Sequence, residues 1–177
     1  MPKTDQELYA RLDALGINYR TVEHEAAFTV EESKSHRDDL PGGHTKNLFL
    51  RDKKKNLWLA TVDEDCPINL KQLRHVLGAS GNLSFGNADL LMEVLGVIPG
   101  SVTAFSVIND TEKRVRMVLD TALMEEELIN GHPLRNDRTT AVTPSALMTF
   151  LKAEGYDPMM VDFKALADEI ATQEAAD

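Results

Sequence analysis

Three segments of this 177-residue chain combine residue types that can do chemistry. The first is Gly42-Gly43-His44-Thr45-Lys46-Asn47. Glycines let the backbone approach a ligand closely, and a lysine at the start of a buried strand offers a point charge to a phosphate or carbonyl oxygen. The spacing differs from the GxxxxGK[ST] phosphate loop. From the pattern alone, the favoured interpretation is a flexible loop leading into a strand, with Lys46 solvated.

The second segment is the turn Gly96-Val97-Ile98-Pro99-Gly100-Ser101. Successive backbone N–H groups in such a turn can face an anion or a developing oxyanion. Glycine and proline also commonly end a helix and connect it to the next element. That structural interpretation is favoured by the local sequence.

The third segment is Gly131-His132-Pro133. Histidine titrates near neutrality and can donate, accept or orient a hydrogen bond, although a single histidine in a turn is more often structural. Cys66 is the one cysteine, and free cysteine more often packs as a small apolar residue than acts as a nucleophile. The five histidines show no HExxH spacing, and one cysteine cannot supply a cysteine-based zinc site. No cofactor is expected.

The charge balance limits the partners of the chain. Nineteen Lys and Arg against 29 Asp and Glu give a net charge of −10, which excludes a basic nucleic-acid coat. Any nucleic-acid contact must come from a local positive patch. No apolar run approaches the roughly 20 residues that span a bilayer, and the N-terminus lacks the apolar core of a signal peptide. A cytoplasmic protein without membrane contact is expected.

Helices are predicted where a capping residue precedes an apolar stripe. Thr4 and Glu7 have capping-box spacing, and so do Thr29 and Glu32. The predicted helices cover residues 4–15, 30–37, 69–77, 88–95 and 144–154. Alternating or β-rich runs predict strands over residues 17–23, 45–51, 57–62, 83–86, 101–108, 114–120, 127–130, 138–143 and 159–163.

The order of these elements predicts an α+β fold in a single domain. Strands and helices are interspersed, and the tight hairpins favour a curved, mixed and mostly antiparallel sheet with helices around it. The domain is expected to cover residues 1–163. Residues 164–177 form an acidic, alanine-rich tail that is predicted to be a loose helix.

Taken in order, several motifs resemble the YbaK/prolyl-tRNA synthetase-associated family of aminoacyl-tRNA deacylases. They are Thr45-Lys46-Asn47-Leu48-Phe49-Leu50, Leu95-Gly96-Val97-Ile98-Pro99-Gly100-Ser101-Val102, Asn130-Gly131-His132-Pro133-Leu134 and Thr139-Thr140-Ala141-Val142-Thr143-Pro144. Each motif is short, and the ordered combination is specific. The resemblance covers roughly residues 1–163 and is closest to freestanding prolyl-tRNA editing proteins that remove alanine from proline tRNA.

The resemblance implies a site and a mechanism. Its lysine, glycine loop and histidine match Lys46, Gly96–Gly100 and His132, so Lys46, Gly96, Gly100 and His132 are the expected catalytic residues. The expected substrate-binding residues are Thr45, Asn47, Val97, Ile98, Pro99, Ser101 and Gly131. The family uses no metal, and a free hydroxyl of the terminal adenosine of the tRNA assists hydrolysis.

Two alternatives stay open from the sequence. The same fold could act on another mischarged tRNA, carrying cysteine or serine, or bind tRNA ends without catalysis. The expected partner is the acceptor end of a mischarged tRNA, contacted over a small footprint with a local positive rim. Prolyl-tRNA synthetase or an elongation factor is a further candidate partner that would raise the local concentration. The sequence leaves the oligomeric state open.

Overall fold

The helices begin where the local capping signals place them. The computed structural model describes residues 1–26 and 41–176, so the predicted helix over 30–37 lies outside the described residues. The α-helices are α1 (Asp5–Ala14), α3 (Leu70–Leu77), α4 (Ala88–Leu95), α5 (Pro144–Ala153) and α6 (Phe163–Ala176). Thr4 and Glu7 form the predicted reciprocal capping box of α1, and Asn87 caps α4 by accepting from the Leu90 N–H at 2.8 Å.

Within residues 1–26 and 41–176, eight strands form one sheet, which is mixed, as predicted. They are β1 (Arg20–Glu23), β2 (Gly43–Arg51), β3 (Leu57–Asp63), β4 (Ser84–Phe85), β5 (Val115–Asp120), β6 (Ile129–Gly131), β7 (Arg138–Val142) and β8 (Met159–Val161). The strand order is β1-β7-β6-β2-β3-β5-β8, with β4 paired to β2. Among the described pairings, β1–β7, β2–β3, β2–β4 and β6–β7 are antiparallel, whereas β2–β6, β3–β5 and β5–β8 are parallel.

The strand predicted over residues 101–108 is wrong. Most of this segment belongs to a 3₁₀ helix, η2 (Ala104–Asn109), which is preceded by an extended stretch. Thr103 and Ser106 cap it reciprocally, the Thr103 N–H donating to Ser106 Oγ at 3.1 Å. Residues 104–108 are all buried, and a short segment buried on every side has no periodicity that separates helix from strand.

A second 3₁₀ helix changes the start of the next strand. Asp120 caps η3 (Thr121–Glu125) by accepting from the Ala122 N–H at 3.1 Å. The predicted strand over residues 127–130 therefore begins later, as β6, and extends through Gly131. This shift places Gly131 within the sheet and His132 directly after it.

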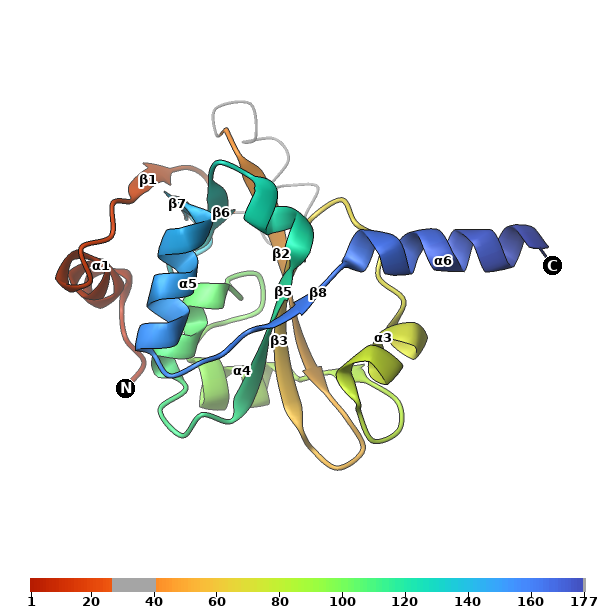
Figure 1. Ribbon diagram of the computed structural model, residues 1–177. Coiled ribbons are helices and arrows are strands. Elements are labelled where there is room, and N and C mark those ends of the chain that lie inside the picture. The colour runs from red at the N-terminus through yellow and green to blue at the C-terminus, as the bar shows by residue number, and fades with distance from the viewer. Residues whose placement is uncertain (27–40, 177) are drawn as a thin grey trace.

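The sheet separates two apolar cores (Figure 1). Helices α4 and α5 cover one face, and α3 and the start of α6 cover the other. Alternate residues of β3 supply both cores: Leu57 and Leu59 pack in the first, and Trp58, Ala60 and Val62 in the second. A strand buried on both faces reads as a continuous apolar run, which is the pattern of β3.

The C-terminal helix is docked to the domain through its first turns. Phe163 is buried in the second core, and Leu166 packs against that core. Gln72 of α3 donates to Glu169 at 3.0 Å. Beyond these turns α6 projects from the body of the molecule (Figure 1). Within the described part of the chain, no helix combines the length and apolar character needed to cross a membrane.

Candidate functional site

Strands β2 and β6 meet where two of the chemistry-bearing segments lie. Their parallel pairing sets Gly43 opposite Ile129 and His44 opposite Asn130. Thr45 Oγ1 donates to the Asn130 carbonyl at 2.8 Å. The structure thus brings the start of β2 beside Gly131 and His132, although some 85 residues separate them in the sequence.

Asn130 fixes this junction from the side of β6. Its Nδ2 donates to the carbonyls of Pro41 and Gly43, both at 3.1 Å. The side chain is buried, and its Oδ1 has no hydrogen-bond partner among the described residues. Because one amide binds both Pro41 and Gly43, the first residue of β2, it fixes the start of the strand that carries Thr45 and Lys46.

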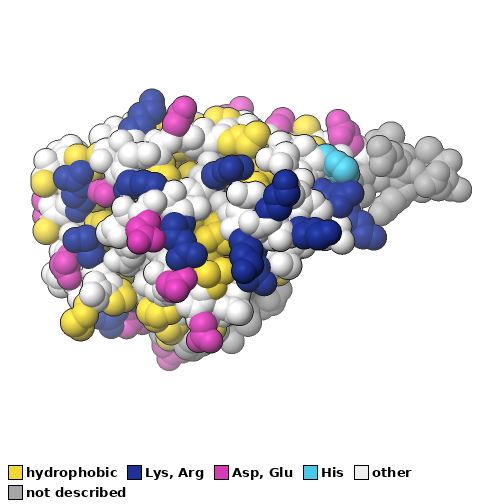
Figure 2. Space-filling model, turned by 90° about the horizontal axis from the view of Figure 1, so that it is seen from below, with side chains coloured by type: hydrophobic (Ala, Val, Ile, Leu, Met, Phe, Trp, Pro, Cys, Tyr) yellow, Lys and Arg dark blue, Asp and Glu magenta, His cyan; other side chains and the backbone are white. Residues whose placement is uncertain are grey.

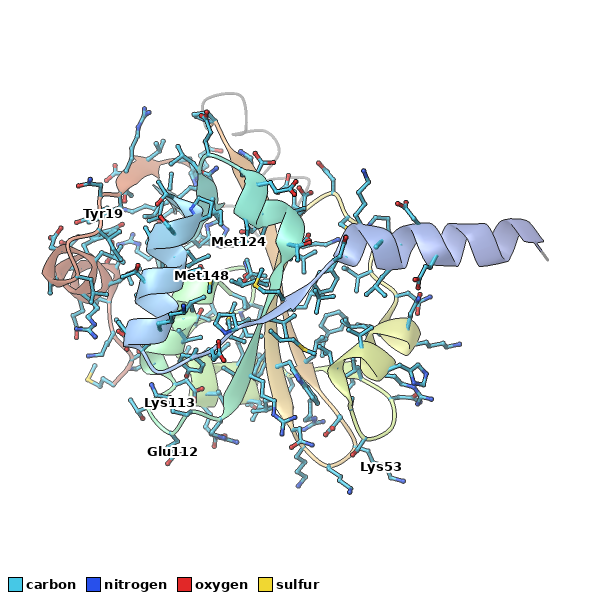
Figure 3. All side chains as sticks on the ribbon, viewed as in Figure 1. Tyr19, Lys53, Glu112, Lys113, Met124 and Met148 are labelled. Atoms are coloured by element: carbon cyan, nitrogen blue, oxygen red, sulfur yellow. The ribbon has the colours of Figure 1, made fainter. Side chains whose placement is uncertain are left out.

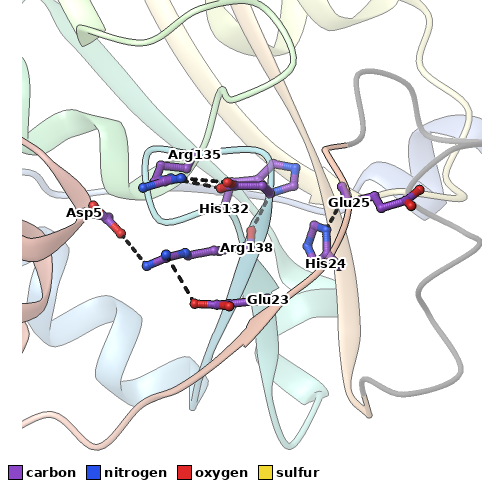
Figure 4. Close-up of polar contacts among 8 residues, drawn as sticks. Asp5, Glu23, His24, Glu25, His132, Arg135 and Arg138 are labelled. Carbon is purple, nitrogen blue, oxygen red and sulfur yellow. Dashed lines mark hydrogen bonds and ion pairs between the residues drawn. The ribbon is translucent and has the colours of Figure 1, made fainter.

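His132 is held in one tautomer by the turn that follows β6. Its Nδ1 lies 2.9 Å from the Arg138 carbonyl (Figure 4). A carbonyl accepts and never donates, so Nδ1 carries the proton and Nε2 of the neutral ring keeps a lone pair. Burial lowers the pKa of His132, and the charge of His24 lowers it further, while the Arg138 carbonyl and Asp137 act in the opposite direction. The neutral form therefore dominates at pH 7.

A second histidine stands beside the first because β1 pairs with β7. The ring centroids of His24 and His132 are 6.3 Å apart. His24 Nδ1 donates to the Glu25 carbonyl at 2.7 Å, and Nε2 lies 2.8 Å from the Thr139 hydroxyl. Both histidines thus have Nδ1 bound to a backbone carbonyl.

An arginine braces the strands that carry the histidines. Arg138 donates to Asp5 of α1 at 3.0 Å and forms an ion pair with Glu23 of β1 at 3.2 Å (Figure 4). Asp5 is buried, so its charge needs this partner. The bridge fastens α1 and β1 to β7 at the residue whose carbonyl orients His132.

The Gly96–Ser101 segment divides into a helix cap and a separate turn. Gly96 ends α4 with φ +64°, and a Cβ there would lie 2.7 Å from Asn109 Nδ2 and 2.9 Å from Pro2. Ser101 N–H then donates to the Ile98 carbonyl at 3.0 Å, closing a turn over Pro99 and Gly100. Gly100 has φ +92°, as the third position of a type II turn requires.

The rest of the segment leads from this turn to the β2–β6 junction. Val97 and Ser101 are buried, whereas Ile98 and Pro99 are exposed. Beyond Ser101, the hydroxyl of Thr103 would lie 3.2 Å from a Cβ added to Gly131. The absence of a side chain at Gly131 therefore lets the segment pack against β6, one residue from His132.

Lys46 lies on the other face of β2 from Thr45 and Asn47. Successive side chains of a strand point to opposite faces, and the cross-strand partner of Lys46 is Val62, which is buried in the second core. The Lys46 ammonium donates to the Cys66 carbonyl at 2.5 Å. Asn47 instead accepts from Thr61 Oγ1 at 2.6 Å. The structure thus gathers Thr45, Gly131 and His132 and places Lys46 across the strand from them.

Cys66 is a poor nucleophile in this setting. Burial raises the pKa of its thiol, and the carboxylates of Asp120 and Asp63 raise it further, against a lowering by Lys46. The protonated thiol is unreactive because the thiolate is the nucleophile. Within the described residues, no group of three or more His, Cys, Asp or Glu side chains is placed to hold a metal ion.

Sequence reasoning missed three polar residues of the junction. Asn130 and Thr139 lie inside motifs that carry the family resemblance, so a closer look at those motifs would have found them. His24 has no local signal. It reaches His132 only because Glu23 pairs with Arg138, a register that the sequence does not display.

Comparison with known proteins finds a family model that matches most of the chain. A family model described as aminoacyl-tRNA editing domain matches residues 24–150, a range that begins at His24 and includes Lys46, the Gly96–Ser101 segment and His132. Prolyl-tRNA synthetase associated domain-containing protein 1 of Mus musculus is 44% identical over 161 residues, which cover 89% of this chain and 95% of the mouse protein.

A further relative and one solved structure are also similar to this chain. The prolyl-tRNA editing protein ProX of Acetoanaerobium sticklandii is 35% identical over 151 residues, covering 85% of this chain and 92% of ProX. A crystal structure assigned as a candidate trans-editing enzyme for prolyl-tRNA synthetase superposes with a TM-score of 0.69 at 17% identity, covering 92% of this chain and 97% of that chain. At 17% identity, the match to this crystal structure supports the fold alone.

Proposed function

Because the chain belongs to the aminoacyl-tRNA editing domain family, we propose that it is a freestanding enzyme that hydrolyses alanine from mischarged proline tRNA. The name of its ProX relative, a prolyl-tRNA editing protein, supports the choice of tRNA. Water adds to the ester carbonyl, the bond from the carbonyl carbon to the ribose oxygen breaks, and that oxygen takes a proton. The products are free alanine and intact tRNA.

The observation that carries the proposal is the orientation of His132. Its Nδ1 proton is committed to the Arg138 carbonyl, and its Nε2 lone pair has no partner among the described residues. Such a nitrogen accepts a hydrogen bond from a ribose hydroxyl of the terminal adenosine. The hydroxyl, held in this way, positions the attacking water, so that orientation supplies part of the rate enhancement.

The Pro99–Gly100 turn supports the developing oxyanion in this proposal. Pro99 has no N–H, and Ser101 N–H is used to close the turn. The Gly100 N–H makes no hydrogen bond among the described residues and is the donor that we assign to the oxyanion. One preorganised donor of this kind contributes about 3–4 kcal/mol to the transition state.

Lys46 is assigned to the tRNA rather than to the water. Its ammonium lies across β2 from His132 and donates to the backbone carbonyl of Cys66. A lysine suits a phosphate oxygen as a point charge. We propose that Lys46 binds a phosphate near the 3′ end and thereby holds the ester at the β2–β6 junction.

A panel of aminoacylated tRNAs tests this function. Proline tRNA charged with alanine, cysteine, serine or proline is incubated with the protein, and the free amino acid is measured. Release of alanine with proline left in place is the expected result. Release of cysteine or serine instead would change the substrate, and binding without release of any amino acid would identify a non-catalytic module.

A further inference from the structure

One end of this acidic protein is basic. Figure 2 shows lysines and arginines gathered over the end of the molecule that carries the β2–β3 turn. We call this surface the basic end and define it by residues that the structure places around that turn: Arg51, Lys53, Lys54, Lys55, Arg74 and Arg116. Lys53 projects from the tip of the turn (Figure 3). The chain as a whole has a charge of −10, so the basic end has the opposite sign to the net charge of the chain.

The turn that presents the three lysines is held in one conformation. The buried carboxylate of Asp52 accepts from the N–H groups of Lys54 at 3.0 Å, Asn56 at 2.8 Å and Ser80 at 2.9 Å. Lys53 N–H donates to the Ser80 carbonyl at 2.9 Å. These bonds use backbone groups, so they do not occupy the lysine side chains. All three side chains are exposed, and none forms an ion pair within the described residues.

The sheet register brings the arginines to the same end. Arg51 pairs with Leu57, and Trp58 pairs with Arg116 on the other side of β3. The guanidinium of Arg116 lies over the Trp58 ring, 5.5 Å from its centroid. Arg74 donates to Asn82 at 3.0 Å. Asn82 lies in the same loop as Ser80, whose carbonyl accepts from the Lys53 N–H. The cations therefore sit on fixed elements.

An open groove borders the basic end. It has a volume of about 510 Å³, and its lining combines the cations Lys113 and Arg116 and the carboxylate of Asp157 with apolar residues such as Trp58 and Val115. The groove exists because β8 pairs with β5 only from Val118 onward, which leaves the first half of β5 uncovered on that side. A polyanion following the cations would thus find a recess beside them.

We propose that the basic end binds the phosphate backbone of the tRNA acceptor stem, an inference that rests on the proposed function. Lys46 and Arg51 are five residues apart on β2, about 17 Å at the rise of a strand. A tRNA with its 3′ end at the β2–β6 junction continues as a chain of phosphates over such a distance. Charge complementarity favours RNA here, because the negative remainder of the surface repels phosphate.

The test compares two triple variants with the same change in charge. K53Q/K54Q/K55Q removes three lysines of the basic end, and K3Q/R20Q/K164Q removes three exposed cations elsewhere. Binding of uncharged proline tRNA is measured by fluorescence anisotropy at several salt concentrations. Hydrolysis is measured on alanyl-tRNA and on an alanylated fragment of the tRNA 3′ end that is too short to reach the basic end.

The first variant is expected to bind tRNA at least about tenfold more weakly than the control variant. The slope of the logarithm of its binding constant against the logarithm of the salt concentration should correspond to up to about three fewer released ions. Hydrolysis of the short fragment should be unchanged. Equal tRNA binding by the two variants would overturn the proposal and leave the basic end for another ligand, such as an acidic protein. Selective loss of binding by the first variant, in a protein that hydrolyses nothing, would support the basic end and reject the proposed function.

Discussion

The Nδ1 atom of His132 donates to the carbonyl of Arg138 over 2.9 Å, across the turn that joins β6 to β7. The bond decides which ring nitrogen carries the proton, and Arg138 is itself fastened to Asp5 and Glu23. The orientation of one imidazole thus depends on an ion-paired strand residue. This relationship makes the protonation state of His132 the most direct test of the site.

Deacylation should require neutral His132. Because burial lowers the pKa of His132, kcat/KM should stay constant from pH 8 to pH 7 and fall only below the ordinary histidine pKa of about 6.5. Rates on saturating and subsaturating alanyl-tRNA between pH 5 and 8 measure this. H132N should lose most activity and this pH dependence, whereas H75N, at an exposed position, should keep both.

The same shift predicts how stability depends on pH. The folded-state pKa of His132 is below the unfolded value, so between these two values the unfolded chain binds more protons. The free energy of unfolding should therefore rise with pH across that window. The contribution of His132 should reach its full value above about pH 6.5. Urea denaturation of wild type and H132N at pH 5.5 and 7.5 should show a smaller difference between the two pH values for H132N.

Lys46→Ala should lower deacylation strongly while the fold persists. The ammonium makes one hydrogen bond, to the Cys66 carbonyl, so its loss should reduce the free energy of unfolding by no more than about 3 kcal/mol. The matched control is Lys164→Ala, an exposed lysine at the start of α6. If activity and melting temperature fall in parallel, Lys46 instead stabilises the start of β2, where it pairs with Val62 of β3.

Alanine at Gly100 and at Gly96 should have different effects. Both glycines have positive φ, +92° and +64°, so each substitution should destabilise by about 1–3 kcal/mol. Gly96, which the family resemblance makes an expected catalytic residue, caps α4, and a Cβ there would meet Asn109 and Pro2, whereas Gly100 supplies the assigned oxyanion donor. G100A should therefore lose kcat at a temperature where it is folded, and folded G96A should retain it. Equal kcat values would remove the oxyanion role from this turn.

Asp52 should contribute stability that acid removes. Burial alone would raise its pKa, but hydrogen bonds from Asn56, Ser80 and Lys54 outweigh burial and lower it. Its contribution is then present above the unfolded pKa of about 3.9 and lost as pH falls through the folded value. D52A should cost about 1–2 kcal/mol at pH 7, and less at pH 3, by urea denaturation. The exposed Asp157→Ala should show neither effect.

The parts of the fold that local chemistry determines were predictable. The capping box of Thr4 and Glu7 and the Asn87 cap mark α1 and α4, and the alternation around the β2–β3 turn marks a hairpin. The mixed sheet was also predicted, and the family match confirms the resemblance. The 3₁₀ helix after Thr103 was missed, because its burial on all sides hides its period.

The site was less predictable, because its geometry depends on pairings between distant segments. Alternation alone places Lys46 and Thr45 on opposite faces of a strand, but which core each face meets follows from the order of the sheet. The contact of His24 with His132 depends on the β1–β7 register. The roles assigned to Lys46, Gly100 and His132 remain predictions that the substitutions above decide.

The last prediction concerns the source of the nucleophile. The thiol of Cys66 has a raised pKa, so Cys66→Ala should change deacylation little. If the free hydroxyl of the terminal adenosine positions the water, its replacement by hydrogen should cost far more, and the loss should persist at saturating tRNA because it acts in the transition state. Single-turnover rates on matched hydroxyl and deoxy alanyl-tRNA measure this directly. Hydrolysis of the deoxy substrate at the normal rate would contradict this mechanism, and so would an acyl-enzyme trapped on Cys66 or a serine. Either result would indicate a protein nucleophile instead of assistance by the tRNA hydroxyl.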